Sequence, residues 1–289
     1  MSFLFERVTI IGVGLIGGSL ARALKKAGVA GEIVGVGRNG DELKLAVELG
    51  VIDSFNQDAA LACANADCVV LATPLGVMKE VLQQIKNSVS ETAVLTDVGS
   101  AKRSVINDVL DVFGVAPPGF VPAHPIAGTE KSGVSASFDT LFKNRCSIIT
   151  PTEHSAPWAV EKTKKMWETT GARTVIMDAQ HHDEVLAATS HLPHLLAYLL
   201  VDTLAKMQEH QEIFEFAAGG FRDFTRIASS DPKMWRDICV ANRDGILNVL
   251  AKFEKELADA RYLLENMDGE GLTRVFKRAQ EARQTHIIG

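Results

Sequence analysis

Three glycines near the N-terminus constrain the fold more strongly than any other feature of this sequence. Gly12, Gly14 and Gly17 have the spacing G-x-G-x-x-G, follow the apolar run 8–13 and open a helical stretch, GGSLARALKKAG. In this context the first glycine permits a tight turn, the second lets the backbone approach a pyrophosphate, and the third lets helix and strand pack closely. We therefore predict a dinucleotide-binding turn, although a plain tight turn in an α/β protein would use the same glycines. The predicted backbone contacts to the phosphates lie at Gly12, Gly14, Leu15, Ile16 and Gly17.

The first 177 residues alternate short apolar runs with helical stretches. The Val- and Ile-rich runs are typical of strands buried on both faces, and strands that alternate with helices form βαβ units and a mostly parallel sheet. Seven strands are predicted, at 8–13, 32–36, 68–73, 93–98, 119–123, 146–150 and 173–177. The expected fold class is α/β, with residues 1–177 forming a Rossmann-type, doubly wound dinucleotide-binding domain.

Strand signals stop after Met177, and residues 178–289 are predicted to be all-helical. Asp178 is a candidate helix cap, and Pro193 should kink the helix that follows, because proline lacks a backbone donor. A loop is expected over 217–235, before the last helices. The apolar positions of this half exceed what its own chain can bury, which predicts a helical dimerisation and substrate domain and a homodimer.

Charge and composition exclude several classes of function. The chain has 289 residues and a formal net charge of −6, which argues against a nucleic-acid partner but not against an anionic small molecule in a locally positive pocket. No apolar run reaches the ~18 residues of a membrane span, and the N-terminus lacks the pattern of a signal peptide. The four cysteines have neither metal-ligand nor C-x-x-C spacing. These features predict a cytoplasmic protein without a membrane partner.

The end of the second predicted strand bears on the choice of dinucleotide. Enzymes that use NAD place an acidic residue about 20 positions after the glycines, where it binds the ribose 2′-hydroxyl. Here that place holds Gly37, followed by Arg38 and Asn39. A guanidinium suits a 2′-phosphate, so NADP is favoured over NAD, although stacking of Arg38 on the adenine would permit both. Three residues at the ends of later strands are further cofactor-binding candidates: Thr73, Pro74 and Asp97.

The segment AHPIAGTEKSG, residues 123–133, places His124 in a loop at the edge of the sheet where a nicotinamide ring is expected. Oxidation of an alcohol carbon needs a group that accepts the hydroxyl proton, and histidine does so near neutral pH. Ser100, in the loop after 93–98, offers a short hydroxyl that would fix the tautomer of that histidine. A structural histidine is the alternative, and the surrounding context favours the catalytic reading.

Five motifs taken together resemble the prephenate/arogenate dehydrogenases of tyrosine biosynthesis. They are GVGLIGGS, TDVGSAK, HPIAGTEKSG, SHLPH and GGFRDFTRIASSDPKMW, in this order over essentially the whole chain. The resemblance implies the oxidative decarboxylation of a cyclohexadienol with hydride transfer to NAD(P). Prephenate would give 4-hydroxyphenylpyruvate, and arogenate would give tyrosine. The absence of the family's cofactor acid at Gly37-Arg38 is a departure from the pattern and puts a preference for NAD in doubt.

The resemblance also implies roles for individual residues. His124 matches the catalytic histidine and Ser100 the serine that orients it. Arg226 matches an arginine that holds a substrate carboxylate, and Arg222 stands where the family can place a basic residue from the other subunit. The implied substrate-binding residues are Thr129, Glu130, His194, Arg222, Arg226 and Trp235. No metal is expected at the histidines of the helical half, because nothing in the reaction needs one.

Two other functions remain as alternatives. Another two-domain NAD(P)-dependent hydroxyacid or imine dehydrogenase would explain the glycines and the helical half, but not HPIAGTE followed by FRDFTR. A non-catalytic dinucleotide-sensing binding protein predicts loss of Ser100, His124 or Arg226, and all three are present.

Overall fold

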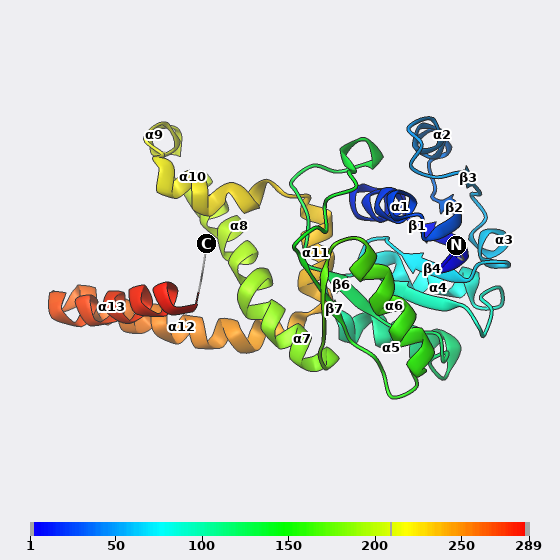
Figure 1. Cartoon of the computed structure of the whole chain (residues 1–289). Coiled ribbons are helices and arrows are strands. Elements are labelled where there is room, and N and C mark those ends of the chain that lie inside the picture. The colour runs from blue at the N-terminus through cyan, green and yellow to red at the C-terminus, as the bar shows by residue number, and fades with distance from the viewer. Residues whose placement is uncertain (1–2, 209, 287–289) are drawn as a thin grey trace. The chain divides into compact units, whose positions relative to one another are not determined.

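A computed structural model describes residues 3–208 and 210–286 (Figure 1). The first sheet and its helices comprise β1 (Phe5–Ile11), α1 (Leu15–Ala27), β2 (Ala30–Val36), α2 (Gly40–Glu48), β3 (Ser54–Phe55), α3 (Ala59–Cys63), β4 (Cys68–Leu71), a 3-10 helix (Leu75–Val77), α4 (Met78–Ile85), β5 (Val94–Asp97) and α5 (Lys102–Phe113). The next elements are β6 (Ala123–Pro125), a 3-10 helix (Val134–Ala136), β7 (Cys146–Ile149), α6 (Pro157–Thr169) and β8 (Arg173–Ile176). The helical part comprises α7 (Ala179–Leu186), a π-helix (Ala187–His191), α8 (Leu192–Ala205), α9 (His210–Glu215), α10 (Gly219–Thr225), a 3-10 helix (Arg226–Ser229), α11 (Pro232–Ala241), α12 (Arg243–Glu265) and α13 (Gly269–His286).

The first sheet has the strand order β3-β2-β1-β4-β5 and is parallel throughout. Successive residues of its strands face opposite layers, as the pleat requires. Val70 belongs to the core that includes residues of α1 and α6, whereas Val69 and Leu71 belong to the core formed with α3, α4 and α5. Helices therefore cover both faces of the sheet, and the predicted Rossmann-type domain followed by a helical part is confirmed.

The seven predicted strands do not form one sheet, which corrects the expectation of a single, mostly parallel sheet. β6, β7 and β8 form a second sheet in which β6 and β7 are antiparallel. The predicted strand 119–123 pairs with β5 only at Phe120, through a bridge to Leu95. Pro122 then interrupts the ladder because it has no N–H to donate, and the chain leaves β5 to start β6.

The predicted loop over 217–235 is also wrong. It contains α10, the 3-10 helix Arg226–Ser229 and the start of α11. The Asp231-Pro232 pair begins α11, with the Asp231 carboxylate accepting from Met234 N at 2.7 Å and Pro232 in the first turn. Proline is well suited to a first helical turn, where the missing N–H costs nothing.

The helix start at Asp178 is confirmed, since its carboxylate accepts from Gln180 N at 2.8 Å and His181 N at 3.1 Å. The irregularity expected at Pro193 takes the form of a five-residue π-helix, Ala187–His191, rather than a simple kink. The wider π-turn accommodates Pro193, which has no N–H to donate to the preceding turn. The ring of His194 contributes as well, because its Nδ1 lies 2.8 Å from the carbonyl oxygen of Ser190.

The chain divides into two compact units, Met1–Arg243 and Asp244–Gly289, of which the described residues are those given above. The first unit includes α7, α8 and α11 together with both sheets, so this division differs from the boundary expected between residues 177 and 178. The domain boundary expected between residues 177 and 178 therefore stays a prediction. In the second unit a tight turn ends α12, where Met267 has a φ of 54° and Asp268 N bonds to Leu263 O at 2.9 Å.

Candidate active site

The glycine turn has the geometry that an anion site at a helix start requires. Gly12 has a φ of +101°, and a Cβ there would lie 2.4 Å from Ala72 O. A Cβ at Gly17 would lie 2.2 Å from Gly12 O, whereas a Cβ at Gly14 would meet nothing within 4 Å. The surroundings of Gly14 are thus open, and no side chain caps α1, which starts at Leu15. The first-turn amides, including that of Ile16, fit a dinucleotide phosphate.

The loop after β4 lies against this turn, since a Cβ at Gly12 would also come within 3.1 Å of Thr73 N. The hydroxyl of Thr73 is buried and has no hydrogen-bond partner within the described part of the chain. Buried hydroxyls are normally satisfied, so an unpaired one beside a phosphate turn suits contact with a bound group. The exposed Pro74 follows and precedes the 3-10 helix Leu75–Val77.

Arg38 and Asn39 are exposed after β2. Asn39 caps α2, because its side-chain oxygen accepts from Asp41 N at 3.0 Å and Glu42 N at 3.4 Å. Gln57 fixes the backbone here by donating to Arg38 O at 2.8 Å. Among residues 3–208 and 210–286, no side chain pairs with the Arg38 guanidinium, which leaves it available to a ligand.

Asp97 has a role inside the protein that differs from the predicted cofactor contact. Its carboxylate is fully buried and forms an ion pair with Lys102, which is also fully buried. It accepts further hydrogen bonds from Gly99 N at 2.7 Å and Ala123 N at 3.2 Å. Lys102 Nζ in turn donates to Ala123 O at 2.7 Å. The pair therefore holds both backbone groups of the residue that precedes His124.

His124 is only 8% exposed and belongs to a chain of hydrogen bonds that runs into the helical part. Its Nδ1 lies 2.8 Å from Nε2 of His182, and Nδ1 of His182 lies 2.8 Å from Oδ1 of Asp183. Asp183 also accepts from the backbone amides of Lys102 at 2.8 Å and Arg103 at 3.0 Å. The first turn of α5, which lacks a side-chain cap of its own, is thus capped by a residue of α7.

The structure places Ser100 in the loop before α5, partly buried. Within the described residues no hydrogen bond joins Ser100 to His124, and His182 occupies the position beside Nδ1 that the sequence argument gave to the serine. Sequence reasoning missed His182 and Asp183 because they lie 58 and 81 residues from the groups that they contact. The adjacent pair His182-Asp183 was the one signal available.

Burial lowers the pKa of His124 well below its usual value, and the charges of His182, Lys102 and His191 lower it further. Burial also lowers the pKa of His182, although Asp183 opposes this shift. Burial acts to raise the pKa of Asp183, but hydrogen bonds from His182 and two backbone amides outweigh it and hold that pKa below its usual value. At neutral pH both rings are therefore neutral and the carboxylate is charged.

A second group of predicted residues lies on α8 and α11. The rings of His194 and Trp235 stack with centroids 3.6 Å apart and planes 17° apart. Trp235 is 8% exposed, and its Nε1 has no hydrogen-bond partner in the described chain. His191 lies edge-on to Trp235, with centroids 6.3 Å apart, and its Nδ1 lies 2.9 Å from Nδ2 of Asn242. The charge of His191 also lowers the pKa of His124. The aromatic wall formed by His194 and Trp235 is therefore near the hydrogen bonds of His124.

Arg226 and Glu130 form an ion pair that joins the start of the 3-10 helix after α10 to the loop after β6. The neighbouring Thr129 accepts from Lys131 N at 3.2 Å within that exposed loop. Burial lowers the pKa of His194, and the charge of Arg226 adds to this, so the ion pair lies near the aromatic wall. Arg222 on α10 is exposed, and no contact with these residues is found in the described chain.

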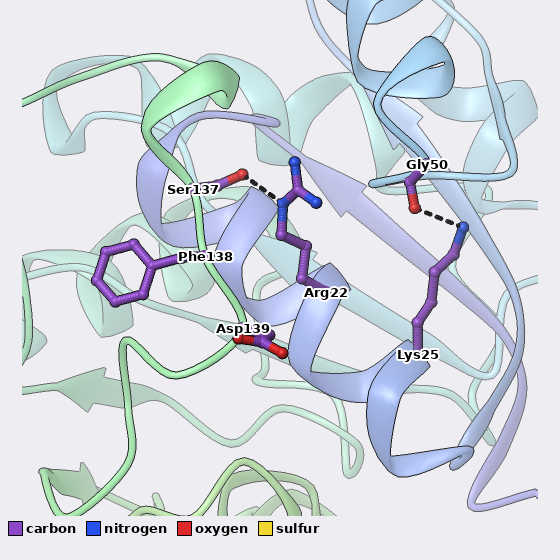
Figure 2. A pocket seen from close by; sticks show the side chains of 6 residues that line it. All are labelled: Arg22, Lys25, Gly50, Ser137, Phe138 and Asp139. Carbon is purple, nitrogen blue, oxygen red and sulfur yellow. Dashed lines mark hydrogen bonds between the residues drawn. The ribbon is translucent and has the colours of Figure 1, made fainter.

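Figure 2 shows a separate hollow beside the C-terminal half of α1. Its cations are committed to the protein: Arg22 Nε donates to Ser137 Oγ at 3.0 Å, and Lys25 Nζ donates to Gly50 O at 3.2 Å and pairs with Asp53 at 2.6 Å. This hollow lies away from the phosphate turn, at the other end of the helix, and contributes nothing to the site described above.

A parallel sheet with an open phosphate turn, and a buried neutral histidine beyond the carboxyl ends of its strands, define the class of two-domain NAD(P)-dependent dehydrogenases. Residues 20–176 match the prephenate dehydrogenase nucleotide-binding domain, and residues 178–278 match the prephenate dehydrogenase dimerization domain. The chain belongs to the prephenate dehydrogenase family, which confirms the resemblance seen in its motifs.

Similar proteins support this assignment over nearly the whole chain. The prephenate dehydrogenase of Bacillus subtilis is 37% identical, over 98% of this chain and 76% of its own length. The cyclohexadienyl dehydrogenase of Zymomonas mobilis is 36% identical, over 96% of this chain and 95% of its own. A crystal structure of prephenate dehydrogenase from A. aeolicus with hydroxyphenyl propionate and NAD+ is 37% identical, with a TM-score of 0.91 over 97% of this chain and 98% of that one.

More distant dehydrogenases share the fold alone. A 3-hydroxyisobutyrate dehydrogenase of Mycobacterium tuberculosis has 13% identity and a TM-score of 0.51. The expected oxidoreductase is therefore confirmed at the level of the family, and the alternatives of a hydroxyacid dehydrogenase or a non-catalytic sensor are not supported.

Proposed function

We propose that this chain catalyses the oxidative decarboxylation of prephenate, arogenate or both, with hydride transfer to NAD(P), as a step of tyrosine biosynthesis. Its similarity to a prephenate dehydrogenase and to a cyclohexadienyl dehydrogenase supports this assignment. The single observation that carries it is the position of His124, which is buried and follows Ala123, whose N–H bonds to Asp97 at the carboxyl end of β5. A neutral imidazole at that edge of the sheet suits the removal of a proton from an alcohol.

In the proposed reaction His124 takes the proton of the ring hydroxyl through Nε2. The nicotinamide, when bound, supplies the chemistry of hydride acceptance from the ring carbon that bears this hydroxyl. The ring carboxylate leaves as CO2 and its bonding electrons complete the aromatic ring as a phenolate, to which His124 returns the proton. The driving force therefore lies in the substrate. The protein mainly aligns the ring and accepts one proton. Ser100, in the adjoining loop, is proposed to contact the same hydroxyl or His124 once substrate is bound.

The substrate carries two negative charges, and its recognition is assigned to the residues near Arg226. This guanidinium would exchange Glu130 for the side-chain carboxylate, and the stacked pair of His194 and Trp235 would form a wall for the ring. Thr129 borders the mouth of the site. Arg222 is proposed to reach the active site of a partner subunit.

NADP is the proposed preferred cofactor, because Arg38, which has no side-chain partner among the described residues, follows β2 in place of an acid. NAD is the alternative, and NAD+ is the cofactor bound to the A. aeolicus relative. No metal is proposed, because proton acceptance by His124 and hydride transfer account for the whole reaction.

A homodimer is proposed as the assembly, located in the cytoplasm, with no nucleic acid or membrane as partner. The run Ala179–Ala205, 27 residues, is long and apolar enough by composition to cross a membrane. It also contains His182 and Asp183, which are committed to the chain of hydrogen bonds at His124. Its exposed apolar side chains fit better with the dimerization domain that residues 178–278 match.

Absorbance at 340 nm tests the proposed function, with prephenate or arogenate as substrate and NAD or NADP as acceptor. We expect turnover with at least one of the four combinations. His124→Asn keeps a polar group but removes the proton acceptor, and should lower kcat by ~10²–10⁴ with little change in cofactor affinity. Near-normal kcat in this variant would remove His124 from the mechanism.

A further inference from the structure

The hydrogen bonds that run from Asp183 to His124 have one allowed direction. At neutral pH the Asp183 carboxylate has no proton to give, so Nδ1 of His182 must donate to it. A neutral imidazole has one N–H, and Nε2 of His182 is therefore an acceptor. The bond of 2.8 Å between the rings then requires Nδ1 of His124 to donate, which leaves the lone pair of His124 on Nε2.

We propose that His182 and Asp183 are positioning residues that fix His124 as the Nδ1–H tautomer, so that Nε2 is free to take the proton of the substrate hydroxyl. The inference deepens the proposed function and rests on the assignment of His124 as the proton acceptor. It gives His182 and Asp183 a role at the active site, in addition to the capping of α5 by Asp183.

The surroundings of the two imidazole rings support one direction for the hydrogen bonds between Asp183, His182 and His124. His182 is fully buried and His124 nearly so, which limits competition from water for the bond between them. The charged and titratable groups that face them are few in the described structure: Lys102 faces both rings, His191 faces His124, and Asp97 faces His182. Lys102 Nζ binds Asp97 and Ala123 O, which hold it in place. The charge of its ammonium opposes a second positive charge on either ring.

Asp183 is itself held in place from several sides, which a positioning residue needs. Its carboxylate accepts from the amides of Lys102 and Arg103, and its carbonyl accepts from Nδ2 of Asn242 at 2.7 Å. Three elements, α5, α7 and the end of α11, therefore meet at this residue. A carboxylate fixed in this way can impose its direction on a neighbouring ring, as in the Ser-His-Asp triad.

The first test reads the tautomer directly. Nitrogen-15 NMR of the protein with labelled histidine distinguishes Nδ1–H from Nε2–H, and the spectrum of His124→Asn identifies the signal of His124. We expect the Nδ1–H form in the unaltered protein at pH 7.5. The Nε2–H form there would overturn the proposal, whatever the activity of any variant.

The second test is a double-mutant cycle. In Asp183→Asn the side-chain amide can donate or accept, so it no longer dictates the direction and no longer balances the cation that forms on His124. We expect kcat to fall at least tenfold, with KM changed less. In His182→Gln the amide oxygen still accepts from His124 Nδ1, but the link to residue 183 is lost. Adding Asp183→Asn to that variant should then cost less than threefold.

The cycle separates positioning from a structural role. If Asp183 merely caps α5, its replacement costs the same in the unaltered background as in the His182→Gln background, and that result would overturn the proposal. His182→Leu, which removes the acceptor altogether, should be at least tenfold less active than His182→Gln. Equal activity of these two variants would also contradict it.

The matched control is His181→Gln, the same substitution at the exposed neighbour on α7, which should stay within twofold of the unaltered protein. His124→Asn serves as the reference for the proposed function. An active His124→Asn variant refutes the proton acceptor itself. An inactive one, beside unaffected Asp183 variants, refutes only the positioning role.

Discussion

Lys102 and Asp97 form an ion pair in which neither side chain is exposed, and between them they hold the N–H and the carbonyl of Ala123. Burial lowers the pKa of Lys102, and the charge of Asp97 acts against that shift. The strand that carries His124 is thus attached to β5 and α5 by a charged pair rather than by a long ladder. Its position depends on both charges being present.

Removal of one partner should therefore be costly. Lys102→Met leaves the Asp97 carboxylate buried without its counter-charge, and we expect the free energy of unfolding to fall by about 3–5 kcal/mol. The double variant Asp97→Asn, Lys102→Met removes both charges and should recover part of this loss. Urea unfolding at pH 7.5 measures each value. A double variant that is no more stable than Lys102→Met would show that the pair is not the cause.

Acid should destabilise the protein through its buried histidines. Burial lowers the pKa of His191 to about 4, and the facing groups are Asp183, His182 and His194. Between this value and the usual ~6.5 the unfolded chain binds a proton that the folded protein does not. Stability is therefore full above pH 6.5 and falls as the pH falls, by up to about 1.4 kcal/mol per pH unit for this group.

His191→Gln tests that dependence, because glutamine cannot be protonated. Urea midpoints between pH 7 and pH 5 should fall less steeply in the variant than in the unaltered protein. The exposed His181→Gln should leave the slope as it is. Parallel slopes for all three proteins would mean that the pKa of His191 does not differ between the folded and the unfolded chain.

Arg226 should matter for substrate binding more than for chemistry. Prephenate and arogenate both have a side-chain carboxylate, so Arg226→Ala should raise KM for both by roughly 10- to 100-fold, with kcat less affected. This increase in KM is smaller than the loss expected for a buried ion pair, because the Arg226 side chain is 62% exposed. Arg226→Lys should recover only part, since it restores charge without the planar fork. Steady-state kinetics with both substrates decide, and an effect on one substrate alone contradicts the shared-carboxylate assignment.

Arg38 should set the preference between the two dinucleotides. Arg38→Ala should weaken kcat/KM for NADP by roughly 5- to 150-fold, the range of one charge-assisted hydrogen bond, and leave NAD nearly unchanged. Replacement of the exposed Lys44 on the adjacent α2 by Ala serves as a control for loss of general positive charge. The proposal fails if the unaltered protein uses NAD tenfold better than NADP.

The helical part should hold two chains together. Its exposed apolar side chains include Leu199 on α8 and, in the second unit, Leu247, Leu257 and Leu264 on α12. Light scattering at micromolar concentration should give about twice the chain mass of 31.2 kDa. A fully active species of 31.2 kDa would contradict both the dimer and the role of Arg222 in a partner's site.

The nucleotide-binding half was readable from the sequence because its signals are local. The glycines at 12, 14 and 17 act within one turn, and the apolar runs of β1, β2, β4 and β5 are bounded by their own helices. The second sheet was misjudged because Pro122 diverts the chain away from β5, and the pattern of apolar residues does not record that change of partner.

The candidate site was only partly readable, for a related reason. His124, His194 and Trp235 were found through motifs, and the structure brings them near one another. His182, Asp183 and Lys102 were not found, because their roles arise from contacts across 58 to 81 residues and from burial that composition does not reveal. The cofactor contact of Asp97 stays a prediction, and its ion pair with Lys102, five residues later, was not foreseen because the sequence does not show that both side chains are buried.

The capping of α5 by Asp183 has a consequence for the order in which the protein matures. A nascent chain that has emerged only as far as β8 contains the strands described above and the phosphate turn, but not Asp183, which caps the first turn of α5. If Asp183 and His182 orient His124 as proposed, we expect such a chain to present the phosphate turn before His124 is oriented. Cofactor uptake and catalytic readiness would then be separate events in biosynthesis, and the second would await the synthesis of α7.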